Sequence, residues 1–201
     1  MKYVFFGTPE FAVLVLWGLI EKGLKPETVF TNPDKPAGRK KIPTSTPVAV
    51  LAESEKIPVI KSGNVRNLET KIEALKEIKA DFFLVVAYGQ ILPPSILAMP
   101  KMGVLNIHPS LLPKHRGPSP IQTAILNGDP ETGTSLMLLD AEIDHGPIIA
   151  QRALAECDMT IINYGELQKK LAELSVNIIL EFLPSYLGGG LAPTPQDHHL
   201  A

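Results

Sequence analysis

Residues 102–149 read MGVLNIHPSLLPKHRGPSPIQTAILNGDPETGTSLMLLDAEIDHGPII, and this stretch decides the fold. Its first part, residues 104–108, alternates apolar and polar side chains, which is the period-2 pattern of a strand. Asn106 and His108 therefore point to the same face of that strand. Pro109 ends the strand, so both polar side chains lie at its carboxyl end, where open α/β sheets bind their ligands.

A second predicted strand, residues 134–139, leads into a polar turn that carries the carboxylate of Asp144 and a Gly-Pro pair. An amide, an imidazole and a carboxylate on two adjacent loops can orient an acyl oxygen, move a proton and set the charge of the imidazole. The spacing alone leaves a second interpretation open. In it, the strand ends in a capped polar turn, and Asn106 and His108 are satisfied structurally.

The whole chain has the size and composition of one globular domain. Its 201 residues can bury a sizeable core, and 45% hydrophobic with 20% charged residues is typical of a soluble protein. A net charge of −2 gives no overall attraction to nucleic acid, so any such contact needs a local basic patch. The single cysteine, Cys157, is interpreted as a structural thiol in a reducing environment. We expect neither a signal peptide nor a membrane span.

The start of the chain has the strand–turn–helix pattern of nucleotide-binding folds. Residues 2–6 read as a buried strand, after which Thr8 is placed to cap a helix with Pro9 at its first position. A dinucleotide site would need G-x-G-x-x-G in the turn that begins at Gly7, and the sequence does not supply it. Binding of NAD is therefore disfavoured.

Further along, the hydrophobic pattern predicts a parallel strand and two helices. Residues 82–87 are nearly all apolar, as in a central parallel strand covered on both faces. Helical spacing is present in residues 67–78 and 163–183, and the second helix is amphipathic and expected to cover the sheet. The chain ends in a Pro-rich segment, in which His198 and His199 are interpreted as solvated tail residues rather than metal ligands.

Residues 32–47, NPDKPAGRKKIPTSTP, form a basic segment that four prolines and a glycine keep from being a long helix. Only Asp34 offsets its cations. Composition leaves two alternatives open, a mobile solvated loop or a basic finger that holds phosphates by a salt-dependent attraction. The basic residues of this segment are Lys35, Arg39, Lys40 and Lys41.

Several separated motifs occur in order along nearly the whole chain. They include N-x-H-P-S-L-L-P at 106–113, F-G-T-P-E-F-A at 6–12, T-N-P-D-K-P-A-G-R at 31–39 and P-T-P-Q-D-H at 193–198. Together they resemble the 10-formyltetrahydrofolate-dependent formyltransferases, and most closely the methionyl-tRNA formyltransferase branch of that family. The resemblance implies a Rossmann-like α/β fold, with a mostly parallel sheet flanked by helices.

The same resemblance implies a domain organisation. Residues 1–187 are expected to be the formyltransferase catalytic domain, and residues 188–201 a Pro/Gly-rich tail or linker. The C-terminal β-barrel domain of the family is expected to be absent, which puts tight binding of tRNA in doubt.

The resemblance also implies a reaction and its residues. The co-substrate is 10-formyltetrahydrofolate, and no metal is expected. Asn106 would hydrogen-bond the formyl oxygen, and His108 would stabilise the negative charge that develops on it. Asp144 would favour the charged imidazole or accept the proton of the amine, and the sequence leaves open which group moves the proton. The expected folate-binding residues are Gln90, Ile91, Leu92, Ser110, Leu111, Leu112, Pro113 and Asp140.

The expected acceptor is the amino group of methionyl initiator tRNA, because in this branch the loop that matches residues 32–47 enters the acceptor stem. Lys35, Arg39, Lys40 and Lys41 would then bind tRNA, and the chain would be a cytoplasmic monomer without a membrane contact. Three alternatives remain: an amino-sugar-nucleotide N-formyltransferase, a 10-formyltetrahydrofolate hydrolase, and a non-catalytic folate- or RNA-binding remnant.

Overall fold

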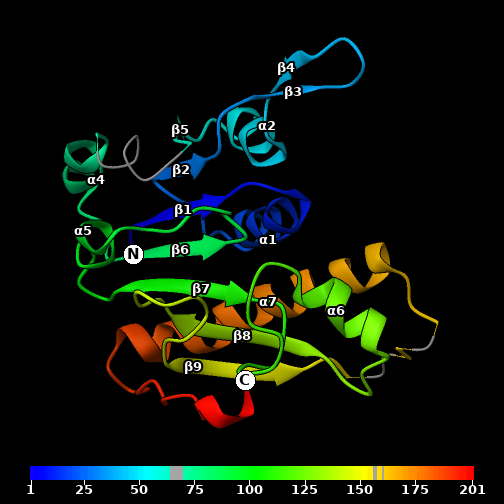
Figure 1. Ribbon diagram of the computed structural model, residues 1–201. Coiled ribbons are helices and arrows are strands. Elements are labelled where there is room, and N and C mark those ends of the chain that lie inside the picture. Colours follow the sequence, from blue (N-terminus) through cyan, green and yellow to red (C-terminus); the bar gives the residue numbers. More distant parts are fainter. Residues whose placement is uncertain (64–69, 156–157, 160) are drawn as a thin grey trace. The chain divides into compact units, whose positions relative to one another are not determined.

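Short apolar runs become buried strands in the N-terminal part of the chain. The computed structural model describes residues 1–63, 70–155, 158–159 and 161–201, and these divide into two compact units, Met1–Val104 and Leu105–Ala201 (Figure 1). In the first unit four strands lie in the order β5-β2-β1-β6, and every pairing among them is parallel. They are β1 (Tyr3–Gly7), β2 (Thr28–Thr31), β5 (Val59–Lys61) and β6 (Phe82–Val86).

Strands β1 and β6 are buried along their whole length because their side chains are apolar on both faces. This confirms the central parallel strand that residues 82–87 predict. The helices of the first unit are α1 (Glu10–Glu21), α2 (Pro47–Ser54), α4 (Ile72–Ile78) and α5 (Pro94–Leu97). Of the helix predicted for 67–78, residues 67–69 lie outside the described residues, as does Cys157.

The predicted capping role of Thr8 is wrong. Helix α1 has Pro9 as its N-cap residue and no side-chain cap. The hydroxyl of Thr8 donates instead to the carbonyl oxygen of Tyr88 at 2.9 Å, which ties the end of β1 to the turn after β6. The local pattern assigns this hydroxyl to the helix, but in the structure it hydrogen-bonds a carbonyl eighty residues away in the sequence.

The basic segment is a β-hairpin whose base is tied to the first unit. Strands β3 (Lys35–Ala37) and β4 (Ile42–Thr44) pair antiparallel and extend beyond α2 (Figure 1). At the base, the Nζ of Lys61 lies 2.6 Å from a carboxylate oxygen of Asp34 and donates to the hydroxyl of Ser45 at 3.2 Å. One side chain of β5 thus holds both ends of the hairpin, and the prediction that no long helix forms here is confirmed.

The second unit contains three antiparallel strands, in the order β7-β8-β9. Helix α7 packs on β8 and β9, as its amphipathic pattern predicts, and Asn163 caps it in a capping box with Glu166. The elements are β7 (Val104–His108), α6 (Pro120–Asn127), β8 (Gly133–Leu138), β9 (Ile148–Ala153), α7 (Tyr164–Leu187) and the short 3-10 helix η1 (His198–Leu200).

The chain after α7 is exposed at most positions, but two of its residues are fixed to the second unit. Thr194 pairs antiparallel with Ile148 through two backbone hydrogen bonds of 2.8 Å, and Gln196 is buried. The ring of His198 stacks on that of His145, with 4.0 Å between the ring centres. His198 and His199 are both exposed, as their interpretation as solvated residues predicts, although the ring of His198 also has partners in the second unit. Within the described ranges, no helix is long and apolar enough to cross a membrane.

Candidate active site

Asn106 and His108 lie on β7 and share one face of it, as the period-2 pattern predicts. Both are almost fully buried, with 7% and 5% of their surface exposed. Among the described residues, none hydrogen-bonds the side-chain amide of Asn106. The amide is not among the fully buried polar atoms that lack a partner, so it keeps some access to solvent and is available to a ligand.

The ring of His108 is held by a backbone carbonyl. Its Nε2 lies 2.9 Å from the carbonyl oxygen of His115. Because a carbonyl only accepts hydrogen bonds, Nε2 carries a proton, and Nδ1 is the ring atom that gains or loses one. Nδ1 lies 3.6 Å from Oδ2 of Asp144, so the sequence-predicted pair is brought together in the structure.

Asp144 lies in the loop between β8 and β9 and is only 8% exposed. Its Oδ2 accepts a hydrogen bond of 2.7 Å from the backbone N–H of Gly117. Its φ of 49° is in the left-handed region, which a non-glycine residue adopts only when its surroundings hold it there. A side chain at Gly146 would collide with the carbonyl oxygen of Leu138, so the loop passes close to the end of β8.

The expected folate residues of the first unit follow β6. Ile91 is 66% exposed, whereas Leu92 is buried and Gln90 half-buried. An exposed isoleucine in a turn at the carboxyl end of a parallel strand suits an apolar ligand. Leu92, in contrast, is part of the core, so its side chain has a structural role whatever else it does.

The expected folate residues of the second unit belong to the segment after β7 and to the loop after β8. Ser110 and Leu112 are buried, and Leu111 and Pro113 are half-buried. The carboxylate of Asp140 accepts a hydrogen bond of 2.6 Å from the ring of His145. Hydrogen bonds from this ring and from a backbone N–H outweigh burial and hold the pKa of Asp140 below its usual range. The folate roles of all these residues stay predictions.

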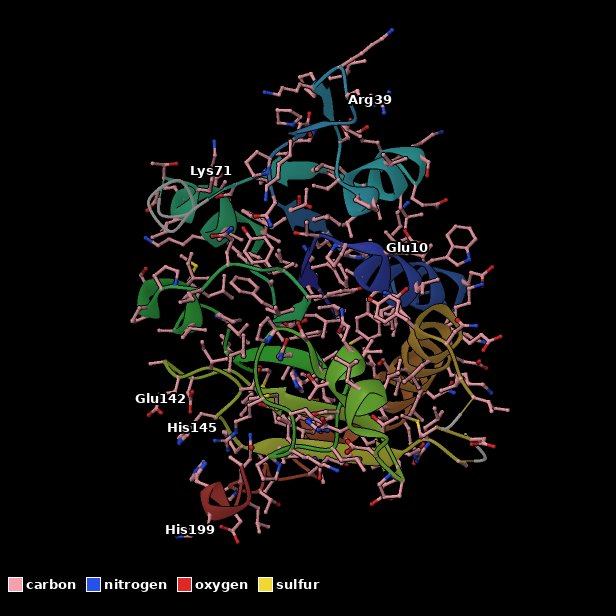
Figure 2. The ribbon with its side chains drawn as sticks, turned by 45° about the vertical axis from the view of Figure 1, so that its right-hand side comes forward. Glu10, Arg39, Lys71, Glu142, His145 and His199 are labelled. Carbon is pink, nitrogen blue, oxygen red and sulfur yellow. The ribbon has the colours of Figure 1, made fainter. Side chains whose placement is uncertain are left out.

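The expected tRNA residues lie on the β3–β4 hairpin. All four cations are exposed, and Figure 2 labels Arg39, which lies between the two strands. The structure thus gathers them on one element of the first unit, while Asn106, His108 and Asp144 belong to the second.

A sequence model of the formyl transferase family matches residues 1–183. The chain belongs to that family. It is 41% identical to a methionyl-tRNA formyltransferase of Halalkalibacterium halodurans and 43% identical to one of Kosmotoga olearia, each over the full 201 residues. It spans 62% and 64% of the length of these two relatives, which is less than two thirds.

Solved structures confirm the Rossmann-like formyltransferase fold. The phosphoribosylglycinamide formyltransferase of Bacillus halodurans is 24% identical and covers 94% of each chain with a TM-score of 0.70. The formyltetrahydrofolate deformylase of Pseudomonas syringae pv. tomato is 18% identical, with a TM-score of 0.72 over 94% of this chain and 61% of its own. At these identities the similarity is one of fold alone.

Sequence reasoning missed the segment that supports the two titrating side chains of this formyl transferase chain. His115 provides the carbonyl that binds His108, and Gly117 provides the N–H that binds Asp144. The ring of His115 is itself hydrogen-bonded to the buried carboxylate of Asp129. Backbone donors and acceptors leave no trace in residue type, so the sequence alone does not indicate this segment. In the described part of the chain, no three His, Cys, Asp or Glu side chains could hold a metal ion together.

Two opposing influences set the protonation of His108. Burial lowers its pKa, because a charged imidazole is poorly solvated away from water. The Asp144 carboxylate and the hydrogen bond to the His115 carbonyl act in the opposite direction. The burial effect is the larger, so the pKa of His108 lies below its ordinary value.

The free energy of unfolding should fall as the pH drops below 6.5, the ordinary pKa of histidine, because of His108. Between that value and the lower pKa of the folded chain, the unfolded state binds more protons, so stability rises with pH in this window. Urea unfolding at several pH values in this window should show that the free energy of unfolding depends less steeply on pH in His108→Gln than in the wild type. His199→Gln, which changes an exposed histidine, serves as control. If the free energy of unfolding of His108→Gln depends on pH as steeply as that of the wild type, the effect belongs to other groups.

Proposed function

We propose that the chain transfers the formyl group of 10-formyltetrahydrofolate to the amino group of methionyl initiator tRNA. The observation that carries the chemistry is the Asn106 amide, which has no hydrogen-bond partner among the described residues and lies on the same strand face as His108, the partner of Asp144. The acceptor is proposed from relatives that bear the name methionyl-tRNA formyltransferase and match the whole chain, hairpin included. Residues 1–187 would be the catalytic domain of a cytoplasmic monomer.

The residues in place fit a flat, partly apolar co-substrate. Ile91 and Ile143, in two of the loops expected to bind folate, are 66% and 67% exposed. We propose that each of them gives an apolar contact to the heterocycle. The co-substrate supplies the formyl group when bound. We propose that it is held by the turn Gln90–Leu92, the segment Ser110–Pro113 and Asp140.

In the proposed mechanism, Asn106 donates to the formyl oxygen and strengthens that bond as negative charge develops there. The Nε2 of His108 is committed to the His115 carbonyl, so the protonated ring is needed for Nδ1 to donate toward the same oxygen. Asp144 favours the protonated imidazole, and the 3.6 Å between Nδ1 and Oδ2 is too long for a direct hydrogen bond. That separation is compatible with a bridging water or the reacting group, through which the amine proton would leave.

Removing the positive charge of the hairpin should weaken the reaction with tRNA and leave folate binding unchanged. Each lost phosphate contact should lower the slope of log K against log salt by about 0.7–0.9. A variant with all four hairpin cations changed to serine should therefore lose up to about three units of slope in tRNA binding. Measurement is by filter binding at several salt concentrations. Lys169→Ser and Lys170→Ser, on exposed α7 positions, are the controls, and an unchanged slope in the hairpin variant would contradict the role.

The proposed function is tested by single-turnover formylation of methionyl initiator tRNA with 10-formyltetrahydrofolate. Formyl-methionyl-tRNA that forms at low salt and declines as salt is added supports it. Co-substrate consumed without an acceptor identifies a hydrolase, and product formed only with an amino-sugar nucleotide identifies that class of acceptor. Folate binding with no turnover on any acceptor identifies a binding remnant.

A further inference from the structure

The amide of Gln196 is fully engaged by the loop that carries Asp144. Gln196 follows the short β-bridge at Thr194 and is 6% exposed, although its neighbour Asp197 is exposed. Its Nε2 donates to two backbone carbonyls, that of Asp144 at 2.9 Å and that of Gly146 at 2.8 Å. Both N–H groups of this amide are therefore hydrogen-bonded to one loop.

The oxygen of the same amide is bound by Arg116. It accepts from Nε of Arg116 at 3.2 Å and from Nη2 at 2.7 Å. Arg116 lies between His115, whose carbonyl binds His108, and Gly117, whose N–H binds the Asp144 carboxylate. A segment of three residues thus contacts both titrating side chains, and Gln196 joins this segment to the Asp144 loop.

A second contact reinforces the connection at His145, the residue between Asp144 and Gly146. Nη2 of Arg116 also lies 2.8 Å from Nδ1 of His198, and the His198 ring lies parallel to that of His145 within 4°. His145 in turn donates to Asp140. The segment 196–198 therefore contacts three consecutive residues of the Asp144 loop, namely Asp144, His145 and Gly146.

We propose that Gln196 is a positioning residue that fixes the separation between Nδ1 of His108 and the carboxylate of Asp144. It touches neither group and acts through the backbone of the Asp144 loop and through Arg116. The backbone of Asp144 is in the left-handed region, which is uncommon for a non-glycine residue, and the two hydrogen bonds from Gln196 to this loop help to hold it there. Glutamine meets the requirement because it presents two donors and one acceptor on a single planar group. A glutamate of the same shape would direct an oxygen at the two carbonyls.

The test that does not depend on the reaction is an NMR titration of the His108 ring in Gln196→Leu and Gln196→Glu. Asp144 raises the pKa of His108, so a loop that moves away should lower that pKa toward the value in Asp144→Asn. Asp197→Asn, which changes the adjacent exposed residue, is the matched control and should titrate like the wild type. Arg116→Gln is a second variant that loosens the same contact from the other side. A His108 titration like that of the wild type in folded Gln196 or Arg116 variants would overturn the proposal.

The kinetic test rests on the proposed function. A small displacement of a reacting group can cost on the order of 10²-fold in rate, so kcat for formyl transfer should fall on that scale in Gln196→Leu. The KM for tRNA should stay unchanged, because the hairpin is untouched. A merely structural glutamine would lower the urea midpoint without shifting the His108 titration. If the wild type forms no formyl-methionyl-tRNA, the proposed acceptor fails, while the titration still decides the role of Gln196.

Discussion

Replacing Asn106 by alanine should lower kcat for formyl transfer by about 10²–10³-fold, the cost of losing one oxyanion donor. This corresponds to about 2.7–4 kcal/mol of transition-state stabilisation. The expected loss is in kcat rather than KM, because the hydrogen bond strengthens as charge develops on the formyl oxygen. The fold should survive, since the described residues give the Asn106 amide no partner to lose. Single-turnover rates and urea unfolding measure the two effects.

Two further variants make this result specific. Asn106→Asp keeps the shape but replaces the donor by a carboxylate, and it should be at least as slow as Asn106→Ala. Asn127→Ala, at the exposed end of α6, should have the wild-type rate. Asn106→Ala with an undiminished kcat would remove Asn106 from the mechanism.

Replacing Asp144 by asparagine should lower kcat by about 10²–10⁴-fold, the usual contribution of a positioned acid or base. The side chain keeps its size, and an amide oxygen can still accept from the N–H of Gly117. What is lost is the negative charge that opposes the effect of burial on His108. The pKa of His108 should therefore fall further, which leaves less protonated imidazole to assist the formyl oxygen.

The rate and the pKa can be measured on the same Asp144→Asn sample. An NMR titration gives the pKa of His108, and rates at several pH values show whether protonation of that ring limits turnover. Asp197→Asn is the control for loss of an acidic charge. A slow variant whose His108 titrates as in the wild type would assign Asp144 to direct acceptance of the amine proton.

Sequence patterns predicted those parts of the site that depend on local periodicity. The alternation in residues 104–108 placed Asn106 and His108 on one face, and the polar turn after the next strand placed Asp144 near them. The amphipathic pattern also predicted that α7 covers β8 and β9. In each case the residue types themselves carry the signal, because burial on one face fixes which positions are apolar.

The rest could not be predicted, because it depends on contacts between residues far apart in sequence. Gln196 is fifty-two residues from Asp144 and eighty from Arg116, and a glutamine in a Pro-rich segment looks like any exposed one. Thr8 was assigned to a helix end because only local partners are visible in a sequence, whereas the carbonyl of Tyr88 is eighty residues away. Buried Leu92 shows the same limit, since an apolar residue beside a site can belong to the core or to the ligand.

The attachment of the hairpin base has a consequence for the entropy of binding. Lys61 joins the Asp34 and Ser45 ends, and the hydroxyls of Thr31 and Thr46 lie 2.7 Å apart beneath them. A segment ordered in this way before it meets a partner loses less conformational freedom on association than an unrestrained loop would. Side chains that contact no nucleic acid can thus contribute to affinity by restricting the free chain. In this protein, Lys61 would contribute to affinity by ordering the unbound hairpin through its contacts with Asp34 and Ser45, without itself contacting the partner.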